Sequence, residues 1–305
     1  MPVTSTRPPQ ASRSLIRRLA RQERLNFWLT NRIPRNLLTR WCGRFSRIRS
    51  PRLTRIVIAI WQKFADDLRL DEAETRSFDS LHDCFTRRLR PGVRPLDPRP
   101  EIAISPCDGV VGAHGEIDGD TLVQAKGLVY TLADLLLDAK LTKTFHNGRF
   151  VTLRLKSSMY HRFHAPLAGR IRRARYISGE VFNVNPPSVR RIEKLFCRNE
   201  RAVIELHPAG QNDDRHATPP GLVLVPVAAV LVASMRLHFV DETFHPRYRG
   251  AERLECNTQV ARGEELGLFH HGSTIIVLLQ PGFRLVESLQ EGATIRMGEA
   301  LARVG

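Results

Sequence analysis

The sequence contains few cysteines, and none of them is paired in a motif. Its five cysteines are scattered singly, with no CxxC pair. This spacing indicates neither a zinc site nor a disulfide framework, and a reducing, cytoplasm-facing compartment is the simplest interpretation. Long apolar runs are also missing, because no run, residues 56–61 included, comes near the roughly 20 residues that a membrane-spanning helix needs. The start of the chain lacks the charged and then apolar pattern of a signal peptide, so secretion is not expected.

The first 60 residues lack lysine and almost lack acidic side chains. They hold fourteen arginines and one acid, Glu23, which gives this segment a net charge of +13 out of +16 for the whole chain. The other residues are therefore close to neutral. A basic charge confined to one end of a chain indicates a polyanionic partner for that segment alone.

The N-terminal segment has the pattern of amphipathic helices on a membrane surface. Residues 1–12 are rich in Pro, Ser and Thr and are expected to be disordered. Over residues 13–75 apolar side chains recur at helical spacing, Pro34 and Pro51 divide the segment into about three helices, and the third is expected from near Leu53 to Leu68. All three tryptophans lie here, at positions 28, 41 and 61. This combination favours helices in the headgroup layer of an anionic membrane, although a nucleic-acid-binding arm, or helices packed on the body with arginine outward, would also fit.

Residues 76–305 have the pattern of a β-rich catalytic body, so the expected fold class is α+β with mostly antiparallel strands. A short helix is expected between Ser77, as its N-cap, and Leu89, with Pro91-Gly92 as its stop. Beyond it, short β-branched runs alternate with Gly, Pro, Asn and Asp, which is typical of strands and turns, and one or two further helices are expected, such as residues 131–137. The expected strands are residues 109–111, 150–155, 169–177, 202–206, 221–232, 254–260, 273–279 and 294–296.

Three short motifs carry reactive side chains. Asp108 lies in a Pro-Cys-Asp-Gly turn, His161 and His164 lie three residues apart before a proline, and Ser273 follows Gly272 at the start of an apolar run. Each motif alone is more typical of structure, because Asp-Gly forms surface turns and Gly-Ser-Thr before a strand is usually a loop. The two histidines could share a helix face, but a zinc site needs a third ligand and none follows at ligand spacing, so no metal is expected.

Taken together, the three motifs supply an acid, a base and a nucleophile. Asp108 would orient a histidine, and that histidine would accept the proton of Ser273. Gly272 adds a feature that an ordinary hydrolase does not need. Without a side chain, it lets the backbone bend until its own carbonyl lies within reach of the Ser273 hydroxyl, which permits an N-to-O acyl shift and then chain scission.

Five motifs, in this order and spacing, resemble those of the phosphatidylserine decarboxylase proenzymes of bacteria and mitochondria. The resemblance extends from about residue 78 to the end, and the basic helical segment matches the membrane-associating region of that family in kind. The chain differs at His271, where the family usually has Leu, and at Cys107, where it often has Ala. Neither change removes a group that the family's chemistry uses. The motifs are SPCDG at 105–109, QAKG at 124–127, YHRFHAP at 160–166, FCRNERAV at 196–203 and HGST at 271–274.

The resemblance implies a cofactor made from the protein itself. His164, held by Asp108, would act as base towards Ser273, which attacks the Gly272 carbonyl to form an ester. β-Elimination then releases a β chain, residues 1–272, and loss of ammonia leaves a pyruvoyl group at residue 273 of the α chain, residues 273–305. The substrate amine forms a Schiff base with this pyruvoyl, which accepts the electron pair left when carbon dioxide departs. His161, one turn from His164 if the segment is helical, is the candidate proton donor in decarboxylation.

The resemblance also implies the location and partners of the enzyme. Phosphatidylserine stays in the bilayer, so the expected partners are an anionic membrane and this lipid rather than nucleic acid, and the expected location is the cytoplasmic side of the cell membrane, as a peripheral protein. The α and β chains of one precursor are expected to assemble, and the enzyme to form a homodimer. Arg198, Arg201 and Lys126 are candidates for binding the headgroup phosphate, although salt bridges within the body would explain them equally well.

Two other classes of function are compatible with parts of the pattern. A serine hydrolase that uses the same relay on an external ester or amide would remain one intact chain, whereas the decarboxylase is expected as two. A non-enzymatic adaptor, binding a membrane or nucleic acid through a β body, would lose nothing on removal of Ser273. Neither alternative explains Gly272 together with both histidines.

Overall fold

The computed structural model describes most of the chain from residue 41 onward. The described residues are 41, 43–65, 67–125, 127–210, 219–229, 234–240, 242–245, 248–270 and 273–304. The expected disordered tail and the first of the expected helices, within residues 1–40, lie outside them, as do His271 and Gly272.

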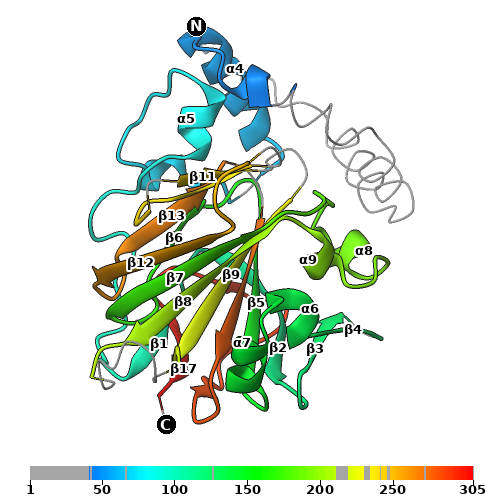
Figure 1. The fold of residues 1–305 in the computed structure, drawn as a ribbon. Helices are drawn as coiled ribbons and strands as arrows, with labels where there is room; N and C mark the ends of the chain where they lie inside the picture. Colours follow the sequence, from blue (N-terminus) through cyan, green and yellow to red (C-terminus); the bar gives the residue numbers. More distant parts are fainter. Residues whose placement is uncertain are drawn as a thin grey trace, which may run out of the picture.

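An antiparallel sheet of eight strands forms the centre of the described structure (Figure 1). β14 (Ser273–Leu279) lies inside this sheet and pairs along its whole length with β9 on one side and β5 on the other. All seven of its residues are buried, as expected for an apolar strand covered on both faces. The strands in spatial order are β12 (Arg253–Val260), β7 (Gly169–Ile177), β8 (Arg201–Pro208), β9 (Leu222–Ala228), β14, β5 (Arg149–Leu155), β2 (Gly109–Glu116) and β16 (Thr294–Ile295).

Two smaller sheets contribute to a first hydrophobic core on one face of the central sheet. Ile275, Val277 and Leu279 of β14 belong to this core, together with apolar side chains of both smaller sheets. The four-stranded sheet consists of β11 (Glu242–Phe244), β10 (Met235–Leu237), β13 (Glu265–Phe269) and β6 (Arg162–His164). The three-stranded sheet consists of β1 (Ile102–Ile104), β17 (Ala300–Arg303) and β15 (Arg284–Leu285).

Short helices and one β-hairpin cover the other face, where they form a second core. Ile276 and Leu278 of β14 belong to this core. Successive side chains of a strand point to opposite faces, so Ser273 lies on the side of the first core and Thr274 on the side of the second. The covering elements are α6 (Leu132–Leu136), α7 (Ala139–Phe145), α8 (Pro186–Val189), α9 (Leu195–Arg198), β3 (Thr121–Ala125) and β4 (Leu128–Thr131) (Figure 1).

The N-terminal elements are shorter than the sequence predicts. α4 (Pro51–Gln62) has Ser50 as its N-cap and ends well before Leu68. Beyond it, Asp67 bonds to Ser158 and to Lys156, and this ties the chain to the body. A 3₁₀ turn, η1 (Leu70–Glu72), and α5 (Leu81–Phe85) follow.

The N-cap of α5 is Ser80 rather than Ser77. Ser80 and Asp83 form a reciprocal capping box, which fixes the start of the helix. Ser77 cannot form such a capping box, because the residue three positions after it is Ser80 and not an acid. The predicted N-cap was therefore wrong, although the helix itself is present.

The predicted fold class, α+β with mostly antiparallel strands, is confirmed. The strands at residues 169–177 and 273–279 begin and end where the sequence predicts. A domain boundary near residue 76 stays a prediction, as does membrane association of the N-terminal segment. Among the described residues, none of the helices is long and apolar enough to cross a membrane.

Candidate active site

Ser273 lies at the buried end of the central sheet. Its neighbours across the sheet are Leu155 of β5 and Ala228 of β9. The side chain is 0 % exposed, and its Oγ atom has no hydrogen-bond partner among the described residues. A buried hydroxyl without a partner is unfavourable. Its position at the mouth of the strand therefore indicates a chemical role rather than a contribution to stability.

The turn that carries Asp108 lies at the same end of the sheet. Val110 pairs with Arg154, which in turn pairs with Thr274, so the turn is two strands from β14, roughly 10 Å at the usual strand spacing. Asp108 accepts two hydrogen bonds from Arg94, at 2.9 and 2.6 Å, and one from the amide of Met297 at 2.9 Å. These bonds hold the carboxylate in one orientation.

His164 is held by partners other than Asp108. Its Nδ1 atom lies 2.9 Å from the Gly263 carbonyl and its Nε2 atom 3.1 Å from the Tyr160 hydroxyl. A carbonyl can only accept, so Nδ1 carries the proton and Nε2 the lone pair. Burial lowers the pKa of His164, whereas the charge of Asp108 acts in the opposite direction. The predicted hydrogen bond between Asp108 and His164 was therefore wrong, and Asp108 acts on the ring through its electric field.

The two histidines lie along a strand rather than on a helix. β6 begins directly after His161 and pairs antiparallel with β13. The His161 carbonyl accepts a hydrogen bond from the Phe269 amide at 2.9 Å, whereas His164 lies opposite Glu265. The prediction of a shared helical turn was therefore wrong. The register places His161 beside Phe269, at the C-terminal end of β13, whereas His164 lies beside the start of that strand.

Helix α5 covers the end of β13. The ring of His161, which is fully buried, lies 4.3 Å from the ring of Phe85, and His82 stacks on His270 at 5.0 Å. The Nδ1 atom of His161 lies 2.8 Å from the Met159 carbonyl, so this nitrogen also carries a proton. The N-terminal part of the chain therefore forms one wall around the residues that precede Ser273.

Two cavities open near these residues. One, of about 370 Å³, has Asp108 and Tyr160 in its wall. The other, of about 460 Å³, lies on the side of the second core and has Thr274 and Arg154 in its wall, and Lys156 lines both. Both volumes fall in the range of small-molecule sites, roughly 300–1,000 Å³.

The arginines predicted to bind a phosphate are engaged elsewhere. Arg201 is 1 % exposed and donates to the backbone carbonyls of residues 134, 135, 197 and 199. Arg198 pairs with Glu180 at 2.8 Å and lies 4.6 Å from the centre of the Phe182 ring. Lys126 lies outside the described residues. The sequence did not single out Arg154, which lines one of the cavities. Its position in a predicted strand does not reveal whether its charge is paired in the folded protein.

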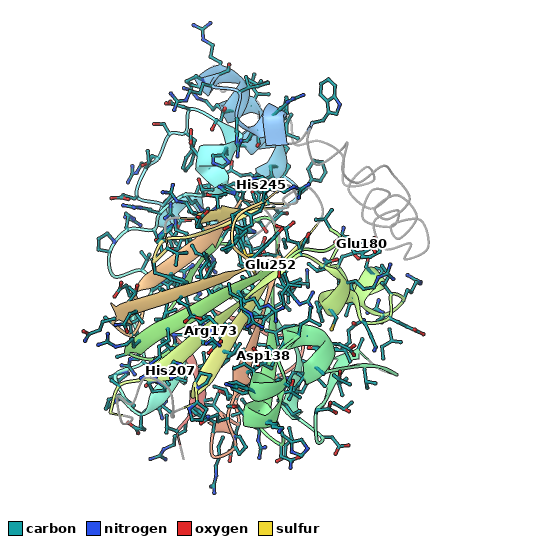
Figure 2. The ribbon with its side chains drawn as sticks, in the orientation of Figure 1. Asp138, Arg173, Glu180, His207, His245 and Glu252 are labelled. Atoms are coloured by element: carbon teal, nitrogen blue, oxygen red, sulfur yellow. The ribbon has the colours of Figure 1, made fainter. Side chains whose placement is uncertain are left out.

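Glu200 is a second buried polar group that the sequence did not single out. Its carbonyl accepts a hydrogen bond from the Ala228 amide at 2.8 Å, and Ala228 pairs with Ser273. Burial raises the pKa of Glu200 to about 8, and hydrogen bonding with the Tyr176 side chain acts in the opposite direction. The hydroxyl of Tyr176 also donates to the carbonyl of His245 at 3.1 Å, and Figure 2 shows His245 near this end of the sheet.

The described residues include no cluster of three or more His, Cys, Asp or Glu side chains that could hold a metal ion. The strands and turns described above instead carry a buried serine, two histidines with fixed tautomers, an oriented carboxylate and an arginine-bearing cavity, and none of the described side chains forms a hydrogen bond with Ser273 Oγ. This arrangement suits proton transfer at a residue within the chain and binding of a small anionic substrate.

Comparisons with known proteins agree with this chemistry. The family model described as phosphatidylserine decarboxylase matches residues 81–303. A phosphatidylserine decarboxylase proenzyme of Halorhodospira halophila is 38% identical over 292 residues, covering 91% of this chain and 92% of the relative. Proenzymes of the same description from Anaeromyxobacter sp. and Chromobacterium violaceum are 36% and 35% identical, covering 88% and 92% of this chain and 94% and 99% of the relatives.

Proposed function

The chain belongs to the phosphatidylserine decarboxylase family, and from this premise we propose that it converts phosphatidylserine to phosphatidylethanolamine and carbon dioxide with a pyruvoyl group made from its own Ser273. Family membership makes the protein a phosphatidylserine decarboxylase. The self-cleavage between Gly272 and Ser273 and the origin of the cofactor are our assignment.

The position of Ser273 is the observation that carries this assignment. Its Oγ atom is buried without a partner among the described residues, so it is not needed to stabilise the fold. Residue 273 is also the first residue of β14 and is held between β5 and β9. A new chain end at this residue would therefore stay anchored at the end of the central sheet. These features fit a pyruvoyl group, which supplies a carbonyl that accepts the electron pair left by departing carbon dioxide.

We assign the proton acceptor in self-cleavage to the Nε2 atom of His164. Its tautomer is fixed by the Gly263 carbonyl, and burial keeps the ring neutral by lowering its pKa. The proton leaves the Ser273 hydroxyl as the bond from Oγ to the Gly272 carbonyl carbon forms, and it passes to the nitrogen of residue 273 as the C–N bond breaks. Asp108, fixed by Arg94, favours the protonated ring through its charge.

We assign return of a proton to the product to His161. The pairing of β6 with β13 supports this, because the His161 carbonyl accepts a hydrogen bond from the Phe269 amide, at the end of β13. The ring is enclosed by Phe85 of α5 and is 0 % exposed, so bulk water has little access to it. Exclusion of water favours delivery of the proton by the histidine itself.

We further propose that the N-terminal segment binds the surface of an anionic membrane. Seven large apolar side chains between residues 41 and 64 are 37–65 % exposed, and basic residues lie among them. An apolar surface with basic neighbours suits the headgroup layer. The homodimer implied by the resemblance stays a prediction. The seven side chains are Trp41, Phe45, Ile48, Leu53, Ile56, Ile60 and Phe64.

The self-cleavage proposal is tested by Ser273→Ala. We expect the purified parent protein to appear on a denaturing gel as fragments 1–272 and 273–305. The intact mass of the small fragment should show a pyruvoyl group in place of an N-terminal serine, a net loss of one ammonia, because the amine and the hydroxyl are lost and a ketone and a methyl group are formed. Ser273→Ala should remain one chain and release no carbon dioxide from phosphatidylserine.

A matched control is Ser157→Ala, which removes the hydroxyl of an exposed serine near the same end of β5. It should cleave like the parent. A single full-length chain in a parent preparation that actively decarboxylates would contradict the proposal.

A further inference from the structure

Arg154 carries a half-buried charge that finds no partner among the residues that the structure describes. Its guanidinium makes no hydrogen bond or ion pair with any described residue. Burial lowers the pKa of Arg154, and the acid that opposes this effect, Asp67, is engaged with Lys156 and Ser158. A guanidinium stays charged in proteins. An unpaired one at a half-buried site is therefore unfavourable until an anion binds there.

The cavity beside Arg154 offers a second unsatisfied donor. Thr274 lies directly opposite Arg154 in the register of β14 and β5, so both side chains are on the same face of the sheet. The Thr274 hydroxyl is 1 % exposed and has no hydrogen-bond partner among the described residues. The Thr152 hydroxyl also lines the cavity, but it is close enough to Tyr130 to influence that hydroxyl, and we assign it no ligand.

The rest of the wall of this cavity contains both apolar and charged side chains, and its chemistry suits a phospholipid headgroup. Val184, Val189 and Phe196 supply apolar surface, while Lys156 and Arg190 add positive charge. One exposed acid, Glu291, also lines the cavity. A phosphodiester bears a single negative charge, several acceptor oxygens and apolar substituents, and these correspond to the guanidinium, the hydroxyl and the apolar wall.

Resting on the proposed function, we propose that Arg154 and Thr274 bind the phosphate of the substrate headgroup. In a serine phosphodiester only one ester oxygen and one methylene separate the phosphorus from the carbon that loses carbon dioxide. The phosphate site must therefore lie within a few bond lengths of residue 273. Thr274 is the next residue along the chain, and Arg154 lies opposite it.

The phosphate is a better ligand for Arg154 than the substrate carboxylate. The carboxylate gives up its charge as carbon dioxide departs, so a cation on it would stabilise the ground state more than the transition state. The charge of the phosphate does not change during the reaction. An arginine on the phosphate therefore adds affinity without opposing the chemical step.

Arg154→Gln is the main test, with Arg154→Lys and Arg170→Gln as companions. Arg170 is an exposed arginine of β7 that contacts Asn257, so its replacement removes the same charge away from the cavity. With dihexanoyl phosphatidylserine as substrate, we expect Arg154→Gln to raise KM about tenfold to hundredfold, as for the loss of a charge-assisted hydrogen bond. The value of kcat should change little. Arg154→Lys should recover part of the loss, and Arg170→Gln should match the parent.

Self-cleavage, followed on a denaturing gel, reports whether a variant folds. Arg154→Gln should still cleave itself. A phosphate-free serine alkyl ether should be turned over equally by the parent and by Arg154→Gln. An unchanged KM for the phospholipid in a cleaved Arg154→Gln protein would overturn the phosphate site. Failure of the parent itself to release carbon dioxide would instead count against the proposed function.

A second measurement uses the parent protein and does not depend on a variant. Phenylglyoxal labels accessible arginines, and peptide mass mapping reports the labelling of Arg154. We expect glycerophosphoserine to slow this labelling, inorganic phosphate to slow it less, and free serine to leave it unchanged. Equal protection by inorganic phosphate and glycerophosphoserine would overturn the headgroup assignment in favour of a general anion site, and no protection by either would overturn the site altogether.

Discussion

The N-terminal segment and the end of β14 depart from ordinary protein structure in opposite ways. Between residues 41 and 64 the protein exposes large apolar side chains to water. At the end of β14 it buries polar atoms without partners among the described residues, in the side chains of Ser273 and Thr274. Either arrangement is unfavourable in an isolated protein. Each is explained if the missing partner comes from outside, a membrane for the first region and a substrate for the second.

A buried ion network joins the two regions. Arg94 bonds to Asp108 at 2.6 Å and to Glu72 of η1 at 2.7 Å. Glu72 follows the segment that carries the exposed apolar side chains, and Asp108 belongs to the candidate active site. The comparison therefore predicts that changes in one region leave the function of the other intact, except at this junction.

The largest effects are expected from replacing His161 or His164, to which different steps, decarboxylation and self-cleavage, are assigned. His164→Ala should abolish self-cleavage, because it removes the neutral ring whose Nε2 atom is assigned to accept the Ser273 proton. His161→Ala should still cleave but lose decarboxylation by a factor of about 10² or more, the usual contribution of a general acid. A denaturing gel reports the first effect and release of labelled carbon dioxide the second.

Binding to vesicles is the internal control for both histidine variants, and it should equal that of the parent. If His161→Ala blocks cleavage while His164→Ala permits it, the two roles are exchanged. The strand register makes this a real test, because it places His161 rather than His164 beside Phe269 at the end of β13.

The sequence was sufficient to predict the class of fold, whereas the roles of the site residues stay predictions and their contacts could not be predicted. The apolar run at residues 273–279 could only be a buried strand, and β14 has those bounds. The His-x-x-His spacing allowed a helix or a strand, and only pairing with β13 decides for the strand. Arg94 could not be predicted as the partner of Asp108, because the sequence does not show which of its many arginines packs against a given turn.

Buried groups without partners could not be predicted from the sequence either. Arg198, Arg201 and Arg154 look alike as residues flanking or within predicted strands. The first pairs with Glu180 and the second donates to backbone carbonyls, whereas the third finds no such partner among the described residues. The difference arises from loops and helices that meet these strands only in the folded protein.

The next largest effect is expected at the junction between the two regions. Arg94→Gln leaves Glu72 and Asp108 close together without the cation between them. Loss of one partner from a buried ion network typically costs about 3–5 kcal/mol in the free energy of unfolding. Urea denaturation should be measured in the Ser273→Ala background, so that a single chain unfolds.

Arg99→Gln is the matched control, because Arg99 is exposed and pairs only with nearby Asp97 among the described acids. It should change stability little. Equal stability of the Arg94 and Arg99 variants would show that the network does not join the two regions.

A smaller effect is expected from the exposed face of α4. The double substitution Ile56→Glu and Ile60→Glu places charge on two side chains that are 59 % and 51 % exposed. Binding to phosphatidylserine-containing vesicles should weaken at least about tenfold, since burying even one isoleucine contributes about 1.5–3 kcal/mol. Cosedimentation measures binding, and self-cleavage should be unchanged. Val123→Glu, which alters an exposed apolar residue of β3, should bind like the parent.

The last effect is a change in the pH dependence of stability at Glu200. Burial raises the pKa of Glu200 from 4.5 to about 8, so the folded protein keeps a proton that the unfolded chain releases. Between these values the unfolded chain binds fewer protons, and stability should therefore fall as pH rises, by up to about 1.4 kcal/mol per pH unit. Glu200→Gln cannot ionise, so urea denaturation in the Ser273→Ala background should show a flatter profile from pH 5 to 8. Burial lowers the pKa of His207 to about 4, so below the ordinary pKa of histidine this residue makes stability rise with pH. This contribution is the same in the parent and in Glu200→Gln, and it cancels when the two profiles are subtracted. Parallel profiles for Glu200→Gln and for the exposed control Glu116→Gln would show that Glu200 is ionised in the folded protein, and the end of β14 would then hold a buried charge rather than a neutral acid.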